Sequence, residues 1–89
     1  MAQSKTVTLR YFAWVREKVG RAEEQVELPV HLSTVSELVS WLKERGPEYG
    51  HAFERANVIR VALDHKHVKP TADITGAREI AFFPPVTGG

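Results

Sequence analysis

One amphipathic helix, set between strand-like segments, is the feature that most limits how this chain can fold. Thr34 is followed three residues later by Glu37, a capping-box pattern, and the apolar residues behind it recur at helical spacing. Gly46 is expected to cap the end of this helix, and Pro47 prevents its continuation. The apolar face of such a helix needs a second layer, and alternating strands can supply one. We therefore expect an α+β domain built around this main helix.

The flanking segments alternate between polar and apolar residues, as half-buried strands do. The expected strands are residues 6–12, 24–28, 58–63, 67–69 and 79–83. Residues 13–19 are expected to form a short helix that ends at Gly20, residues 47–57 a loop with a helical turn, and residues 70–76 a polar connection. This order is typical of one sheet wrapped around one main helix.

Size and charge exclude several classes of protein. Eighty-nine residues, 43% of them hydrophobic, have room for one domain. Twelve Lys and Arg residues balance eleven Asp and Glu residues, so the basic excess that nucleic-acid binding needs is missing. The sequence has no signal-peptide pattern and no apolar run of about 20 residues. We expect a soluble, cytoplasmic protein with neither nucleic acid nor membrane as a partner.

Side chains that often carry chemistry give little indication of a site. There is no cysteine, so disulfides and a thiol nucleophile are excluded. His65 and His67 have an H-x-H spacing, but no third ligand is evident, so no metal site is expected. The carboxylates Glu23, Glu24 and Glu27 are expected to lie on a solvated strand edge.

The last eight residues combine a stiff segment with a bare end; they are Phe82-Phe83-Pro84-Pro85-Val86-Thr87-Gly88-Gly89. Each proline holds φ at about −65° and biases the residue before it toward extended geometry. Gly88 and Gly89 have no side chains and can enter a slot too narrow for other residues. Six residues from Pro84 span roughly 20 Å when extended. We expect the carboxylate of Gly89 to be the working group; the alternative is a frayed, inert terminus.

The element order and the Gly-Gly end resemble the ubiquitin-like β-grasp fold. The final octet is similar to the signature of the small subunit of molybdopterin synthase, the MoaD family, and residues 11–17 match that family's first strand and helix start. The resemblance implies a mixed sheet wrapped on one main helix, with residues 1–83 as the β-grasp domain and residues 84–89 as an extended C-terminal tail. Two glycines and a tail of this kind imply delivery of a group to another protein.

The function that the resemblance implies is that of a sulfur carrier, not catalytic alone. Gly89 would be adenylated with ATP by an E1-like enzyme and converted to a thiocarboxylate with a sulfur donor. Inside the large subunit of molybdopterin synthase, in a complex with two copies of each subunit, the tail would give its sulfur to cyclic pyranopterin monophosphate. No cofactor is expected to bind the chain itself, because ATP is used by the activating partner.

The resemblance also implies a docking surface. If Ile80 and Phe82 face the helix, alternation places Phe83 on the outer face of the sheet, and Phe12 matches a family position that contacts the large subunit. We expect Phe83 and Phe12 to be partner contacts; the alternative is that either ring packs inside this chain.

Further expected contacts lie in the tail and beside it: Pro84, Pro85, Val86, Thr87 and His67. His67 occupies a position where the family has an apolar contact residue, so a more polar rim is expected here. Gly76-Ala77-Arg78-Glu79 is one residue longer than the acidic Gly-Asp-Glu of the family and adds a cation.

Two other functions remain open. One is a different carrier on the same fold, serving thiamine or tRNA thiolation or becoming conjugated to lysines; the Phe82-Phe83-Pro84-Pro85 segment argues against the thiamine carrier. The other is a non-catalytic interaction domain whose tail is inert.

Overall fold

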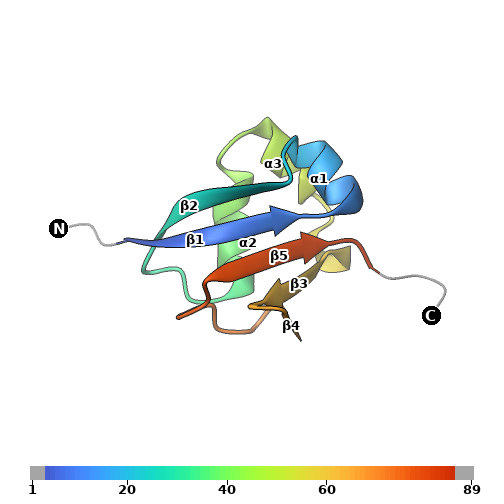
Figure 1. Ribbon diagram of the computed structural model, residues 1–89. Helices are drawn as coiled ribbons and strands as arrows, with labels where there is room; N and C mark the ends of the chain where they lie inside the picture. The colour runs from blue at the N-terminus through green and yellow to red at the C-terminus, as the bar shows by residue number, and fades with distance from the viewer. Residues whose placement is uncertain (1–3, 86–89) are drawn as a thin grey trace.

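Five strands form one sheet, and helix α2 lies across its inner face (Figure 1). The computed structural model describes residues 4–85. Its elements are β1 (Ser4–Tyr11), α1 (Ala13–Val19), β2 (Glu23–Pro29), α2 (Val35–Lys43), α3 (Pro47–Ala52), the 3-10 helix η1 (Ala56–Val58), β3 (Arg60–Leu63), β4 (Lys66–Val68) and β5 (Glu79–Phe83). The expected α+β class and the sheet around one main helix are confirmed.

The sheet is mixed, with the strand order β2-β1-β5-β3-β4. The first strand and the last strand are parallel neighbours in the middle, whereas β2, β3 and β4 pair antiparallel. Parallel strands end at the same edge of a sheet, so β1 and β5 both finish beside α1 (Figure 1). Pro84 and Pro85, which follow β5, therefore come next to the turn that connects β1 to α1.

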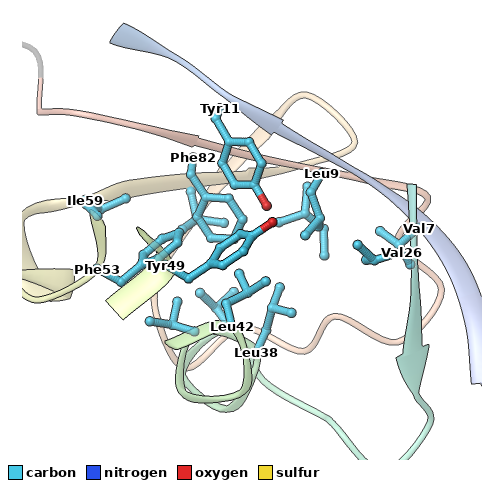
Figure 2. Packing of buried hydrophobic residues seen from close by; sticks show 14 of the residues in the cluster. Val7, Leu9, Tyr11, Val26, Leu38, Leu42, Tyr49, Phe53, Ile59 and Phe82 are labelled. Carbon is cyan, nitrogen blue, oxygen red and sulfur yellow. The ribbon is translucent and has the colours of Figure 1, made fainter. Parts of the chain in front are cut away.

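The core lies between the inner face of the sheet and the helices (Figure 2). Leu38 and Leu42 from α2 are fully buried there, opposite Leu9 of β1. Phe82 of β5 packs edge-on against Phe53, with ring centroids 5.1 Å apart. Burying an aromatic ring of this kind contributes roughly 1.5 to 3 kcal/mol. The largest fully buried side chains are thus Tyr11 of β1, Phe82 of β5 and Phe53, which follows α3.

Local capping signals were predicted correctly at two helix ends and wrongly at one. Thr34 and Glu37 form the expected capping box, and Gly20 caps α1 in the left-handed conformation at φ 92°. Gly46, however, does not cap α2, which ends at Lys43. It precedes α3 instead, in extended geometry, because Pro47 is favoured at the first position of a helix.

Two connections are more ordered than expected. The loop predicted for residues 47–57 contains the whole of α3 and part of η1, and because η1 reaches Val58, strand β3 begins only at Arg60. The connection 70–76 carries Ile74 into the core, where its N–H donates a hydrogen bond of 2.8 Å to the carbonyl of Ser33. A connection expected to be only polar therefore also supplies a fully buried core residue.

Candidate functional site

The candidate site is the carboxyl end of β5, where the tail begins. Alternation along this central strand buries Ile80 and Phe82 and turns Phe83 to the outer face, where it is half-buried. Pro84 and Pro85 follow and are also half-buried. The expected contacts Val86 and Thr87 and the expected reactive residues Gly88 and Gly89 lie outside the described residues. The predictions for these four residues therefore stay predictions.

Phe12 lies beside the end of β5 and presents its ring to the exterior. Its backbone N–H donates a hydrogen bond of 3.0 Å to the carbonyl of Phe82, and its side chain is 41% exposed. Ala13 has a left-handed φ of 53°, which turns the chain sharply from β1 into α1. The guanidinium of Arg10 lies 5.5 Å from the centre of the Phe12 ring. The structure therefore does not bury Phe12 in its own core, as the alternative interpretation required.

His67 covers part of the Phe83 ring from the neighbouring strand pair. The two rings meet edge to face with their centroids 5.0 Å apart. They line a shallow hollow on the sheet together with Arg60, Val61, Val68 and Lys69. A sheet face that carries an aromatic ring and cations is suited to protein contact rather than to bond-making chemistry.

Asp64 holds residues 76–79, the segment that leads into β5. One carboxylate oxygen of Asp64 accepts hydrogen bonds from the backbone N–H groups of Glu79 and Arg78, both 3.0 Å long. These bonds hold the pKa of Asp64 below its ordinary value. Ala77 is buried, whereas Arg78 is exposed. Ala77 thus packs inside the domain, and the cation of Arg78 faces outward.

Glu24 was expected on a solvated strand edge, and that expectation is wrong. Its side chain is only 7% exposed and faces inward, where it accepts hydrogen bonds from Tyr11 at 2.7 Å and from Tyr49 at 2.6 Å. Arg45 and Arg21 lie 3.4 and 3.2 Å from its oxygens. We call these five residues the Glu24 cluster, and Figure 2 shows the two tyrosine hydroxyls pointing toward one another.

The Glu24 cluster is a structural feature that the alternation of β2 could have shown. Val26 and Leu28 face inward, and Glu24 has the same parity. Burial raises the pKa of Glu24, but the hydrogen bonds from the tyrosines and the charges of the arginines outweigh that effect and lower it. Burial and the hydrogen bond to Glu24 raise the pKa of Tyr11 and of Tyr49.

The histidines do not gather into a metal site in the part of the chain that the structure describes. Residues 4–85 contain no group of three or more His, Cys, Asp or Glu side chains placed to hold a metal. His65 occupies the turn between β3 and β4 and lies 3.7 Å from Glu79, whereas His67 contacts Phe83. Across the same residues, none of the helices has the length and apolar character required to cross a bilayer.

Comparison with known proteins identifies the family. A family model described as the ThiS family matches residues 9–89. The molybdopterin synthase sulfur carrier subunit of Haemophilus influenzae is 30% identical over 79 residues, which cover 89% of this chain and 94% of that protein. The subunit of the same name from Escherichia coli is 31% identical over 83 residues, which cover 93% of this chain and 99% of that protein.

A solved structure confirms the fold. SAMP1 from Haloferax volcanii, a small archaeal modifier protein, is similar with a TM-score of 0.70 at 22% identity, over 96% of this chain and 100% of that one. This likeness supports the expected ubiquitin-like β-grasp architecture. The chain therefore belongs to the ThiS family of ubiquitin-like sulfur carriers, and its relatives include molybdopterin synthase sulfur carrier subunits.

Proposed function

We propose that this chain is the sulfur carrier subunit of molybdopterin synthase, and that a thiocarboxylate on Gly89 donates sulfur to cyclic pyranopterin monophosphate. The observation that carries the proposal is the family match, which runs through residue 89 and so includes both terminal glycines. Two bacterial relatives that match nearly end to end bear the name of this subunit. The partners would be the large subunit, as two copies of each chain, an E1-like activating enzyme and a sulfur donor.

The proposed chemistry starts from a carboxylate that needs activation. The α-carboxyl group of a terminal residue is ionised at neutral pH and is a poor electrophile. The activating enzyme would transfer AMP from ATP to one oxygen of Gly89 and release pyrophosphate. Sulfur from the donor would then displace AMP, which leaves with that oxygen, so that a thiocarboxylate remains. ATP would thus be consumed by the activating partner and would not be a cofactor bound to this chain.

The domain would contribute by positioning the tail. Phe83 and Phe12 lie at the edge from which the tail departs, and both present aromatic surface to the exterior. Their burial against the large subunit would contribute roughly 1.5 to 3 kcal/mol for each ring. Binding energy from this remote surface would hold the thiocarboxylate at the substrate, which raises the effective concentration of the sulfur.

The test is the intact mass of the chain after incubation with the activating enzyme, ATP and a sulfur source. A mass gain equal to the difference between sulfur and oxygen would support the carrier function. A chain that lacks Gly89 is the matched control: it should keep its fold and its binding to the large subunit but gain no sulfur. An unchanged mass for the full chain would exclude every carrier function and leave the interaction domain.

A second measurement separates the pathways. Co-purification with a molybdopterin synthase large subunit, followed by formation of the dithiolene product, would support the proposal. Adducts in which the C-terminus is linked to lysines of other proteins would instead identify a protein modifier. Loss of folding on removal of Gly89 would show that the tail is structural.

A further inference from the structure

Three cationic or protonatable side chains surround the outer face of Phe83. Arg60 lies on β3 directly opposite Phe83, His67 contacts its ring from β4, and Lys69 follows β4. All three are exposed and line the shallow hollow described above. We call Arg60, His67 and Lys69 the basic rim.

The basic rim has no carboxylate of its own within the described part of the chain. None of its three members forms an ion pair within 4.0 Å among residues 4–85. Nearer to β1, by contrast, Arg10 pairs with two carboxylates, Glu23 at 3.6 Å and Glu79 at 3.8 Å. The positive charge is therefore concentrated on the side of Phe83 that faces β3 and β4.

The floor of the hollow indicates which kind of anion fits it. The ring of Phe83 supplies apolar surface between the cations, whereas the side chains of Val61 and Val68 lie on the core face of the sheet with Phe82. A small phosphate ligand is usually held by backbone N–H groups at a helix N-terminus or in a turn, whereas none of the residues that line this hollow lies in a helix or a turn. An apolar floor with a cationic edge matches the anatomy of protein interfaces, in which aromatic residues and arginine are enriched.

We propose that the basic rim docks an acidic surface of the protein that receives the tail. Phe83 would enter an apolar patch on that protein, and carboxylates around the patch would pair with Arg60, His67 and Lys69. Opposite charges at such a rim set the rate of association and exclude partners of the wrong charge more than they add affinity. This inference rests on the proposed function, because it takes the large subunit of molybdopterin synthase as the receiving protein.

Charge reversal of the rim tests the inference. We suggest Arg60→Glu and Lys69→Glu, separately and together, with Lys66→Glu as the matched control. Lys66 is exposed on the same short strand, but it precedes His67 and so leaves the strand on the opposite face. Calorimetric titration of the full chain with the large subunit from the same organism would give Kd at about 0.01 M and about 0.15 M salt, where the Debye length is about 30 Å and about 8 Å.

The expected result is a salt-sensitive loss that is confined to the rim. The double variant should raise Kd about tenfold or more at low salt and less at high salt, whereas Lys66→Glu should stay within about twofold of the wild type. Equal Kd values for the double variant and the control would overturn the inference and leave the proposed function intact. A wild-type chain that does not bind the large subunit would overturn the proposed function, and this inference with it.

A nuclear magnetic resonance titration tests whether the hollow binds a phosphate ligand instead of a protein. Inorganic phosphate added to the isotope-labelled chain should not move the amide signals of Arg60, His67 and Lys69 more than those of Lys66. Saturable shifts confined to the three rim residues would show a phosphate site and would overturn the docking proposal.

Discussion

Replacing Glu24 with glutamine tests whether one buried carboxylate holds α3 and the end of α2 against the sheet. The tyrosine hydroxyls of β1 and α3 both donate to the same oxygen of Glu24, which Arg45 also approaches, while Arg21 approaches the other oxygen. Glutamine has nearly the same shape as glutamate and can keep an oxygen at the shared position. Its amide nitrogen would then face Arg21, which is half exposed and can turn to solvent.

The size of the effect follows from the contacts that change. Hydrogen bonds to a charged group contribute about 1.5 to 3 kcal/mol and neutral ones about 0.5 to 1.5, so the two tyrosine bonds lose about 1 kcal/mol each. Loss of attraction to Arg45, whose side chain is 30% exposed, adds up to about 1 kcal/mol after screening by solvent. The expected loss in the free energy of unfolding is therefore about 2 to 3 kcal/mol, a large part of the stability of a small domain.

Urea unfolding followed by circular dichroism measures this loss, with Glu23→Gln as the matched control. Glu23 is adjacent, but its side chain is 61% exposed and forms an ion pair with Arg10 at the surface. The control should lie within about 0.5 kcal/mol of the wild type. For Glu24→Gln the thermal midpoint should fall by roughly 10 to 20 °C. Equal stabilities for the two variants would refute the argument that the Glu24 cluster stabilises the domain.

Three further predictions concern stability. The folded pKa of Glu24 lies below its unfolded value of about 4.3, so the carboxylate stabilises the fold above that pH, and this stabilisation is lost as the pH falls through the folded pKa. In unfolding measurements between about pH 5 and pH 2, Glu24→Gln should therefore lose less stability than the wild type. Ala13→Val should cost about 1 to 2 kcal/mol at the left-handed φ of 53°, while Ala13→Gly should be neutral or stabilising in the same urea assay, and the reverse order would contradict the assigned turn. Phe53→Ala should lower the free energy of unfolding by about 3 to 5 kcal/mol, because the ring is fully buried against Phe82. Val30 is 52% exposed, so the control Val30→Ala should change it by less than about 0.5 kcal/mol. Similar losses for the two variants would show that Phe53 is not part of the core.

The faces on which Phe82 and Phe83 lie follow from the alternation of the last strand alone. A strand places successive side chains on opposite faces, so the face on which Ile80 lies decides the faces of the next three residues. The capping box of Thr34 and the left-handed cap at Gly20 were predictable for a similar reason, because each depends on atoms within one helical turn. The expected helix end at Gly46 was wrong. A glycine followed by a proline can end one helix or begin another, and here Pro47 begins α3.

The amino-acid sequence by itself determined the strands and the main helix, because the spacing of apolar residues and the capping signals are properties of neighbouring residues. Only the tertiary structure decided which distant residues meet. Glu24 and Tyr49 are 25 positions apart, and Phe12 reaches the base of the tail only because β1 and β5, the first and last strands, pair in parallel. Such contacts depend on the strand order of the whole sheet, which forms when every apolar face is buried at once and which no short segment encodes.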